Sequence, residues 1–74
     1  MLVSEIMDAW RSGALPQDME TLIAWKNLVD QAETAAFEAW RTTIDKVKAK
    51  ALITDQLDFL EASKAIHTKI IFLR

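Results

Sequence analysis

The chain has 74 residues, no cysteine, one histidine, one glycine and one proline, and a net charge of −2. A chain of this length forms one domain at most, here residues 1–74. Disulfides are excluded, and a lone histidine without cysteine makes no zinc site. We therefore expect stability to come from close helix packing or from association with another chain.

The two halves of the chain carry opposite charge. Residues 1–38 contain seven acidic and two basic side chains and have a net charge of −5, whereas residues 39–74 contain four acidic and seven basic ones and have a net charge of +3. The halves attract each other within one chain or between chains, although drift in composition explains the asymmetry equally well.

The location of the protein is suggested by what the sequence lacks. No basic segment followed by an apolar run begins the chain, so a signal peptide is not expected. No apolar stretch approaches the roughly 20 residues of a membrane-spanning helix, and the absence of cysteine fits a reducing compartment. We expect a cytoplasmic protein, or a part of an intracellular or virion assembly.

The first expected element is a short amphipathic helix over residues 4–12. Apolar residues recur at helical spacing up to Trp10, and Gly13 suits the left-handed position that ends many helices. A helix this short is not stable alone, so its apolar face must dock on something. Because tryptophan is a common anchor at interfaces, we expect Trp10 to bind a partner.

A long helix over residues 17–52 follows the break between Gly13 and Pro16. Proline favours the first helical turn, and the acidic residues after it suit the positive end of the helix dipole. Apolar residues then recur in steps of three and four, which is the spacing of a helix-packing seam. The predicted seam comprises Leu22, Trp25, Val29, Ala36, Trp40, Ile44 and Val47, and continues with Phe59 and Ile66.

The long helix must end somewhere before the carboxyl terminus. No strong helix breaker occurs in residues 17–74, yet a single helix over that range would be about 85 Å long and would bury little surface. Thr54 and Asp55 belong to residue types that cap helices well. We place the break near residue 53 and expect a third helix over 55–73 that returns antiparallel. Weaker candidates for the break are Asn27, Thr42 and Thr43.

The third expected helix has two apolar faces, one that continues the seam and a smaller one formed by Leu57, Leu60 and Ile71. Two apolar faces on one short helix indicate either a fully buried helix or two partners. Four apolar residues in succession precede the last residue, Arg74, and they would be a liability if exposed. They fold back onto the core or bind a partner, and with Trp10 they are the predicted partner-binding residues: Ile70, Ile71, Phe72 and Leu73.

The three tryptophans are spaced regularly. Trp10, Trp25 and Trp40 lie 15 residues apart, each between an alanine and a basic residue. The spacing has two explanations. One is a degenerate internal repeat. The other, which we favour, is three core aromatics at a spacing close to four helical turns.

No motif for catalysis, phosphate binding or metal binding occurs in the sequence. We interpret His67 as a surface residue, and we expect no enzyme activity, no cofactor, no metal and no small-molecule substrate. The predicted fold is all-α, a short amino-terminal helix plus a long helical hairpin of two to three helices. Association into a homo-oligomer or with a protein partner is expected.

Two functions are compatible with such a fold. The first is a non-enzymatic helical protein–protein interaction module, such as a structural component, adaptor or assembly chaperone of a larger complex of bacterial or phage type. The alternative is a small dimeric regulator or inhibitor that acts on a transcription factor or nucleic acid. Its support is the cluster of Lys46, Lys48 and Lys50. Their spacing by two spreads them around a helix, and the acidic composition does not favour nucleic acid as a partner.

Overall fold

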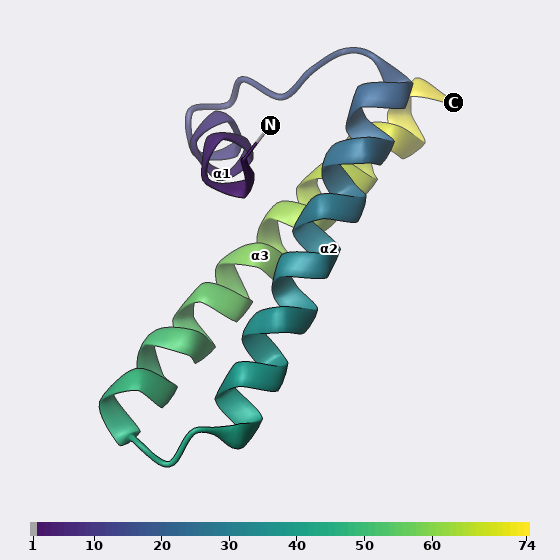
Figure 1. Cartoon of the computed structure of the whole chain (residues 1–74). Helices are drawn as coiled ribbons and strands as arrows, with labels where there is room; N and C mark the ends of the chain where they lie inside the picture. Colours follow the sequence, from purple (N-terminus) through teal and green to yellow (C-terminus); the bar gives the residue numbers. More distant parts are fainter. Residues whose placement is uncertain (1) are drawn as a thin grey trace.

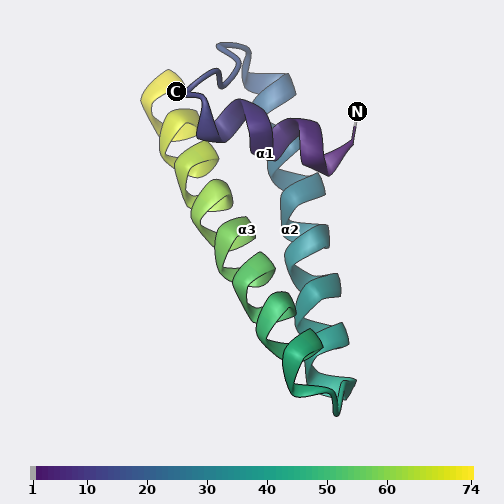
Figure 2. The ribbon, with the colours of Figure 1, turned by 90° about the vertical axis from the view of Figure 1, so that its left-hand side faces the viewer.

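Three helices make up most of the molecule. The computed structural model describes residues 2–74, in which α1 spans Val3–Arg11, α2 spans Met19–Thr42 and α3 spans Lys46–Leu73. α2 and α3 form a long antiparallel hairpin, and α1 lies across it near the end where the chain finishes (Figure 1, Figure 2). The molecule measures 43 × 20 × 20 Å. The predicted all-α hairpin with a short amino-terminal helix is confirmed.

α1 ends in a Schellman motif at Gly13. The backbone N–H of Gly13 donates to the carbonyl of Trp10 at 3.1 Å, and that of Ala14 donates to the carbonyl of Ala9 at 2.8 Å. Gly13 has a φ of +74°, a left-handed conformation that glycine adopts without steric cost. The short helix predicted over residues 4–12 therefore occurs one residue earlier, and Gly13 ends it as expected.

α2 begins two residues later than the predicted start at residue 17. Asp18 is its cap, because its carboxylate accepts the backbone N–H of Thr21 at 2.9 Å and the hydroxyl of the same residue at 2.7 Å. These hydrogen bonds, from the hydroxyl first and the amide second, lower the pKa of Asp18 below its ordinary value. Pro16 precedes the helix instead of opening its first turn.

The hairpin turns at residues 43–45, so the predicted break near residue 53 is wrong, and α2 ends instead at Thr42 and Thr43, which were among the weaker candidates. Asp45 caps α3, and its Oδ1 accepts the backbone N–H of Val47 at 2.9 Å and that of Lys48 at 3.3 Å. The two arms consequently have similar lengths, 24 residues in α2 and 28 in α3. Arms of similar length let each helix bury its apolar stripe along the other.

Local chemistry explains why the chain turns there. Residues 42–44 are three β-branched residues in succession, which lose side-chain freedom in a helix, and Thr43 is extended with φ −88° and ψ 139°. Thr54, one of the caps predicted for the third helix, lies inside α3 instead. Its hydroxyl donates to the carbonyl of Lys50 at 3.0 Å, so it has a partner within the helix.

The core lies where α1 crosses the hairpin. Partly buried side chains, among them Trp10, Trp25 and Phe59, pack around it. No buried residue occurs in residues 37–42 of α2 or 46–61 of α3, so the half of the hairpin nearer the turn has almost no core. The buried cluster comprises Ile6, Met7, Leu22, Val29, Ala62, Ile66 and Ile70.

The predicted seam is correct near the core and wrong at the turn. The seam residues that are buried are Leu22, Val29, Ala36 and Ile66, and those that are partly buried are Trp25, Trp40 and Phe59. Ile44 is 100% exposed and Val47 is 80% exposed. Their place in the seam is lost because the chain reverses at residues 43–45, which ends the register that α2 sets.

Candidate interaction surfaces

A polar cluster joins α2 to α3 beside the core. The hydroxyl of Ser63 donates to Oδ1 of Asp30 at 2.6 Å, and Nζ of Lys26 lies 2.8 Å from Oδ2 of Asp30. Ser63 is buried, so the carboxylate replaces the hydrogen bond that its hydroxyl would make to water. Further toward the turn, the side-chain amide of Gln56 donates to Glu33 at 3.0 Å. These contacts fix the register of the two helices.

The electrostatics of Asp30 indicate a structural role. Partial burial raises the pKa of Asp30, but hydrogen bonds from Lys26 and Ser63 and the charge of Lys26 outweigh it, so the pKa lies below the ordinary value of 3.8. A carboxylate with a lowered pKa and two partners is a weak general base at neutral pH.

Replacing Asp30 with asparagine is expected to reduce the loss of stability in acid. Because the folded pKa of Asp30 lies below 3.8, its ionised form stabilises the fold above about pH 4, and this stabilisation disappears as the pH falls through the folded value. The effect is small because the side chain is 45% exposed. Urea titrations at several acidic pH values measure it, with Gln31→Asn as a nearby control that changes no ionisable group. Identical pH dependence in the wild type and Asp30→Asn would contradict this expectation.

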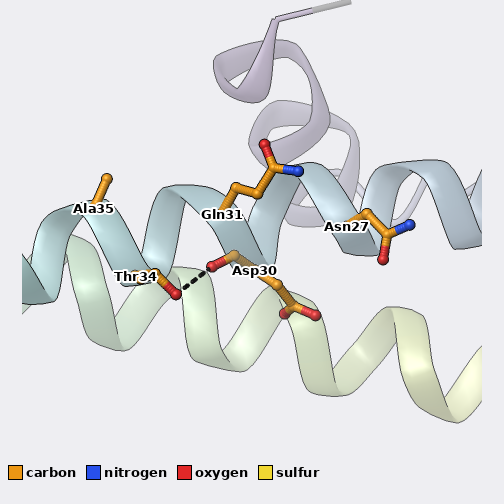
Figure 3. Close-up of a pocket in the computed structure, with 5 residues that line it drawn as sticks. All are labelled: Asn27, Asp30, Gln31, Thr34 and Ala35. Atoms are coloured by element: carbon orange, nitrogen blue, oxygen red, sulfur yellow. Dashed lines mark hydrogen bonds between the residues drawn. The ribbon is translucent and has the colours of Figure 1, made fainter.

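A depression on α2 beside this cluster does not form a ligand site. Figure 3 shows its lining side chains, all of which come from a single helix: Asn27, Asp30, Gln31, Thr34 and Ala35. The hydroxyl of Thr34 donates to the backbone carbonyl of Asp30 at 3.1 Å, so it is already paired. Side chains from one exposed helix face cannot enclose a small molecule as ligand pockets do.

Two cationic side chains tie the amino-terminal segment to α3. Arg11 of α1 lies 3.4 Å from the carboxylate of Asp58, and Nζ of Lys69 donates to the backbone carbonyl of Leu15 at 3.1 Å. The guanidinium of Arg11 also lies 6.0 Å from the ring centroid of Trp10. Trp10 itself is partly buried against the core. Its predicted role in partner binding stays a prediction.

The sequence allowed the apolar residues in the last turn of α3 either to pack on the core or to face a partner, and the structure contains residues of both kinds. Ile70 is buried in the core, whereas Ile71, Phe72 and Leu73 are exposed, Phe72 by 82%. Leu57, Leu60 and Ile71, the second apolar face in the sequence, lie within about 60° of arc on α3 and are exposed as well. We name these exposed residues the C-terminal apolar surface: Leu57, Leu60, Ile71, Phe72 and Leu73.

The turn end of the molecule presents a different surface. The exposed Ile44 and Val47 lie there among basic side chains, and Trp40 lies one helical turn earlier. The sequence prediction missed this surface because it placed the apolar residues inside the seam. The signal was the run of β-branched residues directly before Asp45, a good helix cap. We name this surface the hairpin tip: Trp40, Arg41, Ile44, Lys46, Val47, Lys48 and Lys50.

Neither a metal site nor a membrane-spanning helix adds to these surfaces in residues 2–74. Within residues 2–74, no three histidine, cysteine or acidic side chains come together as metal ligands would. None of the described helices has the length and apolar character needed to span a membrane. Comparison of the chain with models of known protein families, with curated proteins and with solved structures finds no match. A function must be inferred from the chain's own surfaces.

Proposed function

We propose that the protein is a non-enzymatic helical protein–protein interaction module that binds an apolar helix of a protein partner through its C-terminal apolar surface. The observation that carries this proposal is Phe72, which is 82% exposed only two residues after the buried Ile70. Because Ile70 anchors the last turn of α3 in the core, the exposed side chains beside it are held in a fixed position.

The composition of this surface fits a helix-binding site. Leu57 and Leu60 are separated by one helical turn, and Ile71 lies on the same side of α3. Between them, Lys64 lies on the same side of α3, 3.6 Å from the carboxylate of Glu61, so a polar pair separates Leu57 and Leu60 from the apolar last turn. An apolar centre with a polar rim is the usual arrangement of protein interfaces, and helix partners are bound through anchors spaced by three or four residues.

The partner is another protein or a second copy of this chain. Self-association is supported by the small core and by the opposite charges of residues 1–38 and 39–74. A surface that binds a partner and catalyses no reaction suits a structural component, an adaptor or an assembly chaperone. A cytoplasmic location, or one within an intracellular or virion assembly, belongs to the same proposal.

Replacing Phe72 with aspartate is expected to weaken association by at least about tenfold, as for the loss of an interface hot spot. Light scattering coupled to size exclusion measures the mass of the full chain alone, and affinity capture from the native host measures binding to other proteins. The matched control is Ile44→Asp, a fully exposed apolar position in the turn before α3, at the other end of the hairpin. A monomeric wild type whose captured proteins are all retained by Phe72→Asp would contradict the proposal.

The exposed lysines do not support nucleic acid as an equal candidate. Lys46 and Lys50 lie on one side of α3, and Lys48 lies on the opposite side because successive residues advance by about 100°. A nucleic-acid-binding domain is usually basic, with its cations clustered on one face or along a helix, whereas this chain has a net charge of −2.

A further inference from the structure

The hairpin tip exposes apolar side chains at one end of a rod. Ile44 is 100% exposed within the turn, and Val47 is 80% exposed in the first turn of α3. The molecule measures 43 × 20 × 20 Å, and the turn between α2 and α3 lies at one end of its long axis (Figure 1). Two apolar side chains at the end of a rod offer little area for packing against a second rigid rod. They suit a soft surface into which they can insert.

Cations surround these apolar side chains. Lys46, Lys48 and Lys50 are exposed and lie within about 6 Å of one another along the axis of α3. Among residues 2–74, the ion pairs of the structure do not include these three lysines. The carboxylate of Asp45 is engaged by backbone amides at the start of α3. The positive charges of the three lysines therefore face solvent on more than one side of α3, within its first two turns.

An aromatic pair lies on α2 beside the cations. Trp40 is partly buried, and its ring centroid lies 5.8 Å from that of Phe37. Tryptophan has an apolar ring with one polar N–H, and it is enriched where hydrocarbon meets water. Because Trp40 is two residues from the end of α2 and the lysines are in the first turns of α3, aromatic ring and cations lie at a similar level of the rod.

The rest of the chain has the opposite charge. Residues 1–38, which include α1 and most of α2, have a net charge of −5. An anionic surface attracts the hairpin tip and repels this acidic part, which favours an end-on orientation. A plane of anionic headgroups also accepts cations from every side of a helix that stands end-on to it.

We propose that the hairpin tip docks end-on onto an anionic lipid surface. Ile44 and Val47 enter the interfacial region, and the three lysines contact the negatively charged headgroups. The proposal concerns the end of the molecule opposite to the C-terminal apolar surface. It does not depend on the protein partner proposed above.

The experiment is co-sedimentation of the full chain with vesicles of phosphatidylcholine and phosphatidylserine in about equal parts, at low salt. We expect binding that decreases with salt and is absent with pure phosphatidylcholine. Ile44→Asp is expected to reduce binding at least about tenfold, because an inserted aliphatic group is replaced by a charge. Lys48→Glu is expected to reduce it by about tenfold or more, because each charge near the surface contributes about fivefold.

Matched controls locate the binding end. Lys64→Glu makes the same charge change on α3 away from the tip, and Phe72→Asp makes the same apolar-to-acid change on the C-terminal apolar surface. Both should bind vesicles as the wild type does, within about twofold. Because all these side chains are exposed, circular dichroism should show an intact fold in each variant. Phe72→Asp tests the proposed function and Ile44→Asp tests the lipid proposal, so failure of one is separable from failure of the other.

A local probe gives an independent reading. The chain has no cysteine, so Ile44→Cys carries a polarity-sensitive dye at one site only. Its emission should shift to shorter wavelength with the anionic vesicles, whereas the same dye on Phe72→Cys should not shift. The proposal is overturned by absence of vesicle binding at low salt, by equal binding to pure phosphatidylcholine, or by a shift at Phe72→Cys instead. It is also overturned if the tip binds a DNA duplex and no vesicle.

Discussion

Replacement of Ile66 with alanine is expected to lower the free energy of unfolding by about 3 kcal/mol, as for other large-to-small changes in a protein core. Ile66 is fully buried on α3, in one cluster with Leu22 and Val29 of α2 and with Ile6 of α1. Truncation leaves a cavity at the point where all three helices meet. Domains of this size have only a few kcal/mol of stability, so the variant should be largely unfolded at moderate temperature.

Urea denaturation followed by circular dichroism measures this effect. The control is Leu57→Ala, a change of similar size on the same helix at a position that is 56% exposed. It should alter the free energy of unfolding by less than about 1 kcal/mol. Similar losses in the two variants would show that Ile66 does not occupy the core position described above.

Replacement of Ile6 with alanine is expected to release α1 from the hairpin. Ile6 is 0% exposed, and α1 has only nine residues, too few to be helical without tertiary contacts. The expected loss is again about 3 kcal/mol. It removes the docking of α1 first, because α2 and α3 keep their own contacts, such as those of Ser63 and Asp30.

Hydrogen exchange resolved along the chain separates local release from global unfolding. The amides of α1 should exchange much faster in Ile6→Ala, with a smaller change in the part of α2 and α3 near Val29 and Ser63. Leu2→Ala, at a position 68% exposed, should leave the exchange of α1 close to that of the wild type. Uniform acceleration across all three helices in Ile6→Ala would contradict the expected order.

The amino-terminal part of the fold was predictable from sequence because its signals are local. Gly13 marks the end of the first helix, and the hydrogen bonds of its Schellman motif involve only residues close in the chain. The antiparallel return and the buried Leu22, Val29 and Ile66 follow from apolar periodicity, which the core preserves. These features need no knowledge of how the helices pair.

The position of the turn was not predictable in the same way. Thr54 and Asp45 are both capping residue types, and the sequence offers no proline or glycine to choose between them. The choice depends on pairing, because a turn at residues 43–45 gives two arms that match in length. The periodicity of apolar residues also continues past Thr42. Ile44 and Val47 were therefore assigned to the seam, although the chain reverses there. The hairpin tip was missed for this reason alone.

The uneven distribution of buried residues determines which part of the hairpin opens first in partial unfolding. All large fully buried side chains lie near α1, and none lies in residues 37–42 or 46–61. Subglobal opening from the turn therefore separates the distal arms without exposing the central cluster, and it costs only a fraction of the global free energy. The stability of the rod is graded from end to end.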